Sequence, residues 1–173
     1  MKKLLYIVLA VFALGLSGCE KDDAEQSLGA NMWGFTPDGF GRGDYRTKTT
    51  TLSVQGYQQF EAISQDNPGG DGNGIASTVK FFFKNVNPPP TGTYKVVAYE
   101  DLEHEDEVAV YYQVFGDPRF GGSQAYFFSH NDAGQSISYT FKNGKVSLTC
   151  SAIPLYQSGA GPERGLLSAN ISQ

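Results

Sequence analysis

Cysteines, basic residues and long apolar segments are all scarce in this chain of 173 residues. Two cysteines are too few for a framework of disulfide bonds. The 13 Lys and Arg residues are outnumbered by 18 Asp and Glu, and the net charge of −5 leaves no basic surplus to neutralise phosphates. We therefore expect no nucleic-acid partner. The chain is 40% apolar, however, which excludes disorder throughout.

The apolar run near the start of the chain is too short to span a membrane. It covers residues 4–16, 13 residues without a charge, and it follows Lys2 and Lys3. At about 1.5 Å per residue a helix of this length extends roughly 20 Å, whereas the hydrocarbon core of a bilayer is about 30 Å thick. A basic start followed by a short apolar run is typical of a secretory signal peptide, which is removed from the mature protein.

A cysteine follows this run almost at once. Residues 16–19 read Leu-Ser-Gly-Cys, which resembles the lipobox of bacterial lipoproteins. The resemblance implies cleavage between Gly18 and Cys19 and acylation of the Cys19 thiol, so that Cys19 becomes a lipidated N-terminus. The alternative is an ordinary signal peptide in which the cysteine has no such role.

Residues 20–26 are mostly charged and have no apolar periodicity, so they predict a solvated tether. The cluster Lys21, Asp22 and Asp23 is similar to the acidic export signal of surface lipoproteins of the phylum Bacteroidota. That resemblance implies a lipid anchor in the outer membrane, with the protein facing the cell exterior. The alternative is a plain spacer and a periplasmic location. We therefore expect three parts: a signal peptide (1–18), a lipidated flexible tether (19–30) and one all-β domain (31–173).

The rest of the chain favours strands over helices. Gly and Pro, which number 21 and 8 in the whole chain, interrupt most windows that are long enough for a helix. Only residues 58–64 are compatible with one or two helical turns, and they are equally compatible with a short strand. Alternating and aromatic-rich runs predict strands at 49–56, 75–83, 93–99, 108–115, 124–129, 137–141, 146–150 and 167–171. Asn143-Gly144 separates two of these runs and predicts a two-residue hairpin of type I′.

Strands at such short spacing, without helical crossovers, predict antiparallel pairing. Their alternation requires that one face be covered. We expect an all-β fold, an antiparallel two-sheet β-sandwich of about eight strands, with a β-barrel as the alternative. The order of features from residues 31–35 to the C-terminal hairpin is similar to that of small all-β lipoproteins of the Bacteroidota, which implies the same fold class.

Aromatic residues are the candidate binding groups, since the chain has 12 Phe, 10 Tyr and one Trp. Trp33, Tyr111 and Tyr112 are the residues that we expect to stack on a ligand such as a sugar, and other tyrosines, Tyr99 and Tyr126 among them, are further candidates. The alternative is that they pack in the core. Tyr111 and Tyr112 are neighbours in a predicted strand, so their side chains must point to opposite faces.

Residues 100–107 contain six acids and His104. Carboxylate oxygens suit hard cations such as calcium, which makes Glu103, Glu105 and Asp106 candidate ligands. The run lies between two predicted strands and lacks the aspartate-glycine spacing of a calcium loop. We therefore favour a solvated loop without a metal.

No catalytic constellation is visible in the sequence. Cys150 falls on the apolar side of a predicted strand and is expected to be buried and inert. The two histidines, His104 and His130, accompany no strained Ser-centred turn. We expect no cofactor and a surface-anchored lipoprotein whose domain is a non-enzymatic module that binds a glycan or a protein. The alternatives are a small surface hydrolase, whose two acids can lie anywhere along the chain, and a purely structural lipoprotein of the cell envelope.

Overall fold

The computed structural model describes residues 27–55, 59–66, 74–84, 87–131, 134–157 and 163–172. Within these ranges the chain forms eleven strands and two short 3-10 helices, η1 (Tyr99–Asp101) and η2 (Pro118–Phe120). The strands are β1 (Met32–Pro37), β2 (Gly43–Arg46), β3 (Thr49–Gln55), β4 (Gln59–Gln65), β5 (Ala76–Phe83), β6 (Gly92–Val97), β7 (Glu107–Phe115), β8 (Ala125–Ser129), β9 (Ser136–Lys142), β10 (Lys145–Gln157) and β11 (Arg164–Ser172).

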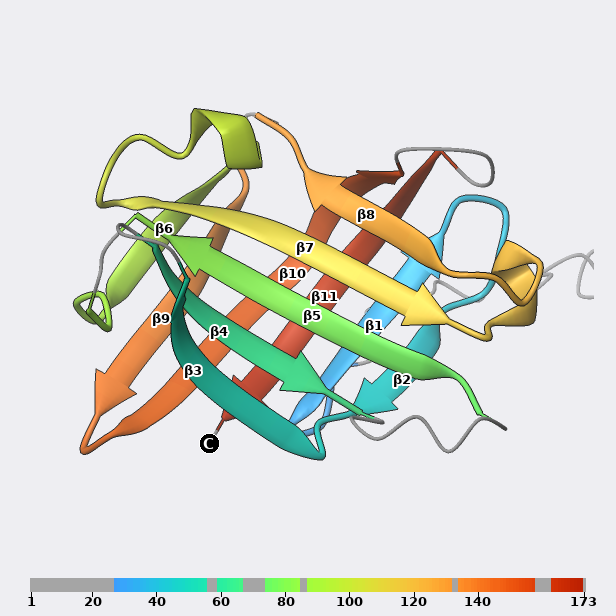
Figure 1. Ribbon diagram of the computed structural model, residues 1–173, viewed down its shortest axis with the longest axis horizontal. Coiled ribbons are helices and arrows are strands. Elements are labelled where there is room, and N and C mark those ends of the chain that lie inside the picture. The colour runs from blue at the N-terminus through green and yellow to red at the C-terminus, as the bar shows by residue number, and fades with distance from the viewer. Residues whose placement is uncertain are drawn as a thin grey trace, which may run out of the picture.

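The strands form two layers over a shared core (Figure 1). One layer has the order β2-β1-β11-β10-β9, and the other contains β7, β5, β4 and β3. Two strands join the layers: β6 pairs with β9 and β7, and β8 pairs with β7 and β10. The all-β, sandwich-like fold expected from the sequence is confirmed.

The core lies between the layers and follows the alternation of the strands. In β5 every second side chain is buried, namely Ser77, Val79, Phe81 and Phe83. Contacts between the layers are aromatic or hydrogen-bonded. The ring of Phe35 stacks on that of Tyr112, with centroids 4.3 Å apart, and Trp33 Nε1 donates to Ser77 Oγ at 3.0 Å. The largest fully buried side chains are Trp33, Tyr112, Tyr139, Phe35, Phe81, Phe83, Phe127, Ile137, Leu148, Ile153, Leu155 and Leu167.

The predicted count of about eight strands is wrong, because the sequence did not reveal β1 and β2 and left residues 58–64 open. The latter form the strand β4. In β1 the alternation is broken because Trp33, Gly34 and Phe35 are all buried. Phe35 packs so closely on Gly165 of β11 that a side chain there would collide with its ring. The sequence of one strand does not show which residues of a neighbouring strand it packs against, so this contact could not be predicted.

One strand pair corrects the expectation of purely antiparallel pairing. β6 and β7 run parallel, with Val96 opposite Val108. Their connection, residues 98–106, is a short crossover that contains η1 and most of the acidic run. Ser129 completes the junction, because its Oγ accepts from Val110 N at 2.8 Å and donates to Val97 O at 2.6 Å. The side chain of Ser129 thus links β6 to β7 just beyond their last paired residues, a contact that sequence patterns do not indicate.

β10 extends beyond its predicted range of 146–150 and bends at a β-bulge. Its pairing with β11 shifts between Cys150 and Ile153, where Ala152 has a φ of 49°. The first half of β10 pairs with β9 and the second half with β8. A bulge bends a strand and increases its twist, so β10 can serve two neighbours in succession.

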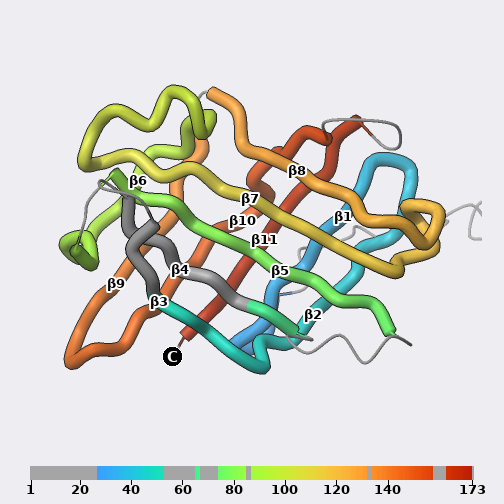
Figure 2. Tube along the Cα trace, viewed as in Figure 1, coloured from blue at the N-terminus to red at the C-terminus, as the bar shows by residue number. Residues whose placement is uncertain are grey.

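Both ends of the domain lie at the same end of the molecule. Asn31, just before β1, accepts through Oδ1 from Ser172 N at 2.8 Å. The C-terminal mark in Figure 2 shows where β11 reaches this lower end. The predicted signal peptide, the lipidation site Cys19 and the cluster Lys21, Asp22 and Asp23 lie outside the described residues. The described part of the chain contains no helix that is long and apolar enough to cross a membrane.

The β9–β10 hairpin tests the strand assignment. Asn143 and Gly144 have φ values of 54° and 74°, and a Cβ built on Gly144 would contact nothing within 4 Å. Gly144→Val should therefore lower the free energy of unfolding by about 1–3 kcal/mol through backbone strain alone. Asn143→Gly should change it far less, since glycine adopts the same φ. Urea unfolding measures both, and equal midpoint shifts would contradict the turn geometry.

Candidate ligand-binding face

The outer face of the sheet carries a row of mostly aromatic side chains that runs from β5 across β7 and β8 to β10 and β11. Lys80 of β5 lies opposite Tyr111 of β7, and Tyr111 lies opposite Phe128 of β8. Phe128 lies opposite Tyr156 of β10, which lies opposite Arg164 of β11. Directly paired residues project from the same face of a sheet. We call these five residues the outer aromatic row, and its four inter-strand steps span roughly 19 Å at about 4.8 Å each.

Contacts within this row are aromatic in its centre and cation–π at its ends. The rings of Tyr111 and Phe128 meet edge-on with centroids 5.1 Å apart. Lys80 Nζ lies 5.7 Å from the centroid of Tyr111, and the Arg164 guanidinium lies 6.0 Å from that of Tyr156. Aromatic rings bracketed by cations make a surface that is apolar in the middle and polar at both ends.

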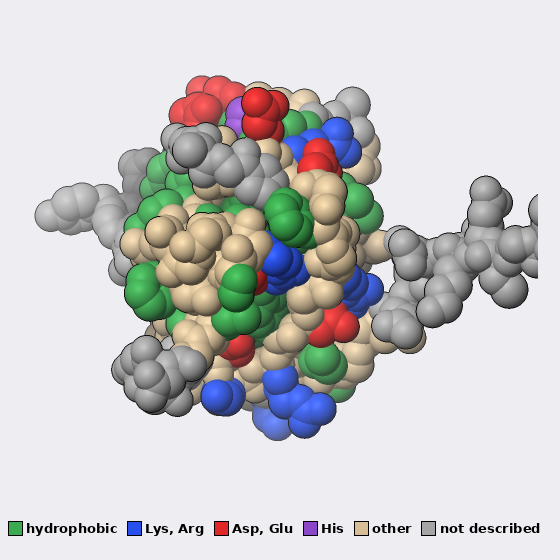
Figure 3. Space-filling model, turned by 90° about the vertical axis from the view of Figure 1, so that its right-hand side faces the viewer, with side chains coloured by type: hydrophobic (Ala, Val, Ile, Leu, Met, Phe, Trp, Pro, Cys, Tyr) green, Lys and Arg blue, Asp and Glu red, His purple; other side chains and the backbone are tan. Residues whose placement is uncertain are grey.

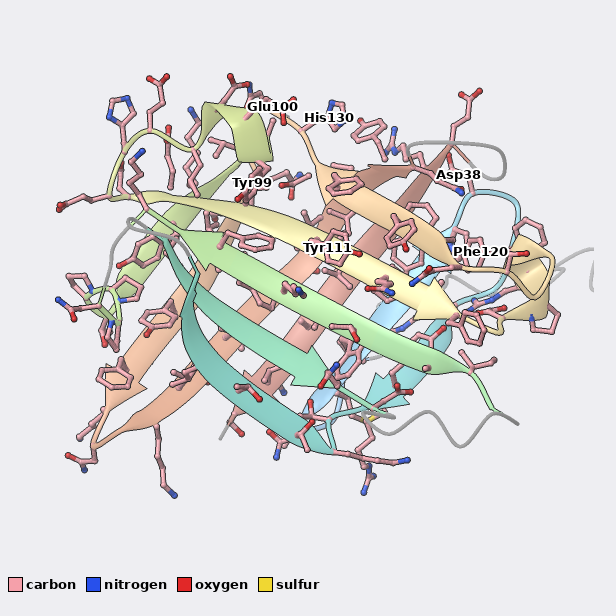
Figure 4. The ribbon with its side chains drawn as sticks, in the orientation of Figure 1. Asp38, Tyr99, Glu100, Tyr111, Phe120 and His130 are labelled. Atoms are coloured by element: carbon pink, nitrogen blue, oxygen red, sulfur yellow. The ribbon has the colours of Figure 1, made fainter. Side chains whose placement is uncertain are left out.

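A hollow of about 200 Å³ opens beside the row. Tyr99 of η1 forms its outer wall and contacts Phe82 edge-on, with centroids 5.0 Å apart. Figure 4 shows Tyr99 and Tyr111 on the same side of the sheet. Pockets for drug-sized ligands have roughly 300–1,000 Å³, so this one suits a single ring. We call it the Tyr99 pocket, and its lining residues are Lys80, Phe82, Tyr99, Ala109, Val110, Tyr111 and Phe128.

Tyr111 presents a protonated hydroxyl beside the aromatic surface. Burial raises its pKa to about 12, and the neighbouring Tyr126 adds to the shift. The hydroxyl donates to Gln113 Oε1 at 3.0 Å, which leaves the amide nitrogen of Gln113 and the tyrosine oxygen as further polar groups. The face therefore combines ring surfaces with hydrogen-bonding groups.

The structure separates the three aromatic residues that the sequence grouped as stacking candidates. Tyr111 is half-buried on the outer face, as a stacking role requires. Trp33 and Tyr112 are both completely buried in the core, so the predicted stacking role is wrong for them. In Tyr112 the alternation of β7 turns the ring inward onto Phe35, and in Trp33 the indole is enclosed between β1 and β5.

Most of the outer aromatic row was not predicted as a site. Lys80 and Phe128 lie in predicted strands, but nothing in a single strand shows which partners stand beside them. Tyr156 lies beyond the predicted end of its strand, after the bulge. Tyr99 was assigned to a strand and instead begins η1. The available signal was the prediction of strands at 108–115 and 124–129, because Tyr111 and Phe128 take outward positions once the pairing of these strands is known.

The acidic run forms a turn that is organised by one buried carboxylate. Glu107 Oε2 accepts from Glu103 N at 3.0 Å and from His104 N at 2.9 Å. Burial alone would raise the pKa of Glu107, but these backbone donors hold it below its usual value. The candidate cation ligands Glu103, Glu105 and Asp106 are all exposed. Within the described residues, no group of three or more His, Cys, Asp or Glu side chains could hold a metal ion.

Cys150, His130 and His104 lie in three different parts of the fold: in β10, just after β8 and in the acidic turn. Cys150 is partly buried against the core, and burial raises the pKa of its thiol to about 12, so it stays protonated at neutral pH. His130 packs on Tyr156, with ring centroids 4.5 Å apart, near one end of the outer aromatic row. His104 is exposed in the acidic turn. Neither arrangement activates a nucleophile.

A charged cluster at the other end of the sheet ties the two layers together. Arg119 of η2 pairs with Asp117, donates to Gly41 O at 2.7 Å and donates to Tyr45 Oη at 2.9 Å. Tyr45 of β2 in turn donates to Asp117 Oδ2 at 3.2 Å. Burial would raise the pKa of Asp117, but the hydrogen bonds and charge of Arg119 lower it below its usual range. Every member is engaged within the protein, so this cluster is structural.

Charge alone does not mark a binding site on the face shown in Figure 3, where acidic, basic and apolar side chains are interspersed. Comparison with family models, curated proteins and solved structures finds no match to this chain. The outer aromatic row and the Tyr99 pocket are therefore interpreted from their own geometry.

The cluster around Arg119 predicts a specific stability profile. Arg119→Met should lower the free energy of unfolding by about 3 kcal/mol, because it leaves the buried Asp117 carboxylate without its counter-charge. The double variant with Asp117→Asn should lose less than the sum of the two single losses. Because the pKa of Asp117 is lowered on folding, its contribution is present at neutral pH and is lost as the pH falls below about 4.

Urea unfolding at pH 7 and pH 3 measures this profile. The pKa of Glu107 is also lowered, so its contribution to stability depends on pH too, and the wild type and Asp117→Asn must be compared at both pH values. The difference between them should shrink at the lower pH. Strictly additive losses, or a pH-independent difference, would contradict the interpretation.

Proposed function

We propose that this protein is a lipoprotein anchored in the outer membrane, facing the cell exterior, whose β domain binds a glycan without catalysing a reaction. The observation that carries the proposal is the outer aromatic row beside the Tyr99 pocket. The anchor rests on the lipobox-like residues 16–19 and on the charged cluster at 21–23.

Sugar rings have an apolar face of C–H groups and an edge of hydroxyls, so they fit surfaces that offer both kinds of contact. Tyr99, Tyr111 and Phe128 supply the ring surfaces. Gln113 and the Tyr111 hydroxyl supply hydrogen-bonding groups at the edge. Because aromatic side chains have few rotatable bonds, such a surface binds with a small loss of conformational entropy.

The position of the row relative to the anchor supports the same function. The tether precedes Asn31, which is bonded to the C-terminal strand at the lower end of the molecule. Tyr99 and His130 lie toward the upper end in Figure 4. The tether therefore joins the domain at the end opposite the pocket, and its attachment leaves the pocket open to extracellular glycans.

The outer aromatic row favours binding over the two alternatives. A hydrolase needs two facing acids or an activated nucleophile, whereas the Tyr99 pocket is lined by one cation and otherwise by aromatic and aliphatic residues. A purely structural lipoprotein has no need for half-exposed tyrosines around a hollow, since exposed apolar clusters carry a risk of aggregation.

Binding should depend on aromatic residues of this face and not on exposed aromatic residues elsewhere. Tyr99→Ala and Tyr111→Ala should each weaken glycan binding about tenfold or more, as expected for central aromatic contacts. Phe40→Ala is a matched control, because Phe40 and Tyr99 are both 46% exposed but Phe40 lies in the β1–β2 turn. A glycan array probed with the full chain in detergent, followed by titration calorimetry, measures the effect. Equal losses in all three variants would contradict the proposed site.

Localisation tests the anchor. Cys19→Ala should abolish labelling with a fatty-acid probe. Replacement of Lys21, Asp22 and Asp23 by Ala should keep the label but shield the protein from protease added outside intact cells. Labelling that survives in Cys19→Ala would remove the lipoprotein assignment. Equal protease sensitivity of the wild type and the triple variant would show that the charged cluster is only a spacer.

A further inference from the structure

On the basis of the glycan-binding function above, we propose that the Tyr99 pocket holds an acidic sugar residue, one that carries a carboxylate or a sulfate group. The feature that points to this ligand is Lys80, the single charged residue in the lining of the pocket. All other lining residues are aromatic or aliphatic.

The charge of Lys80 has no acidic partner among the described residues. The ion pairs found within 4 Å among the described residues, Arg42 with Asp44 and Arg119 with Asp117, both lie at the other end of the sheet and do not involve Lys80. Lys80 instead directs its ammonium toward the ring of Tyr111, 5.7 Å from the centroid. An ammonium beside a partly desolvated aromatic surface attracts an anion more strongly than it would in open water.

Acidic residues near the pocket would repel a ligand with many negative charges. The ligand is therefore expected to carry one acidic group, bound by Lys80. Glu100 and Asp101 follow Tyr99 in η1, and Asp101 accepts from Asn131 Nδ2 at 2.6 Å. A long polyanion would meet these acids, whereas a single acidic sugar in a mostly neutral glycan would not.

The other end of the outer aromatic row is a poorer anion site. Arg164 lies over Tyr156, but Glu163 precedes it and is exposed. Asp38 also lies close, since its N–H donates to Arg164 O at 2.9 Å. These acids offset the guanidinium charge. The preference for an acidic sugar should therefore depend on Lys80.

The test compares glycans that differ only in charge. The probe is an array of uronic-acid and sulfated oligosaccharides, each printed beside its carboxyl-reduced or desulfated counterpart, and the full chain is applied in detergent. The wild type should bind at least one acidic member about tenfold more tightly than its neutral counterpart, as expected for one charge-assisted hydrogen bond. Lys80→Gln should remove this preference, and Lys80→Arg should keep it.

Lys142→Gln is the control, because it removes an exposed lysine from the β9–β10 hairpin. It should keep the preference, and circular dichroism should show that all variants are folded. Equal binding of neutral counterparts, or a preference that persists in Lys80→Gln, would overturn the acidic-sugar assignment while glycan binding stands. Binding to no glycan in either form would overturn the proposed function itself, and the acidic-sugar assignment with it.

Discussion

The pairing of β7 with β5 on one side and β8 on the other determines both the core and the outer face. Alternation along β7 turns Val110 and Tyr112 inward and Tyr111 outward. Since the side-chain period of a strand is two, a slip of one residue would exchange these sets. It would bury Tyr111 and expose Tyr112, which now stacks on Phe35. The burial that stabilises the fold is therefore the same constraint that aligns the aromatic row.

A few buried polar groups fix the conformation of the connection between β6 and β7. Ser129 bridges Val97 and Val110 where the parallel pair of β6 and β7 ends, and Glu107 accepts two backbone N–H groups of the preceding turn. Together they hold the short connection that carries Tyr99. Buried polar groups are costly unless satisfied, so the connection has one preferred conformation rather than several. The wall of the Tyr99 pocket is positioned in this way although η1 is only three residues long.

Local sequence patterns predicted the features that are determined by residues close together in the chain, such as single strands and tight turns. The alternation in 75–83 and the Asn143-Gly144 turn both correspond to observed elements, β5 and the β9–β10 hairpin. The opposite orientations of Tyr111 and Tyr112 were also predictable, but which of them faces inward depends on the partner strands. The row from Lys80 to Arg164 joins residues 84 positions apart. It could not be read from periodicity, because it exists only after five strands are paired.

Trp33 gives the molecule an optical property that follows from its place in the core. It is the one tryptophan of the chain, it is completely buried, and its indole N–H bonds to Ser77 of the opposite layer. Indole emission responds to water, so its fluorescence reports the separation of the two layers. The outer aromatic row lies on the outer face of the sheet, across β5, β7, β8, β10 and β11, and ligands bound there leave the indole enclosed. Tryptophan fluorescence thus follows unfolding and is separate from occupancy of the outer face.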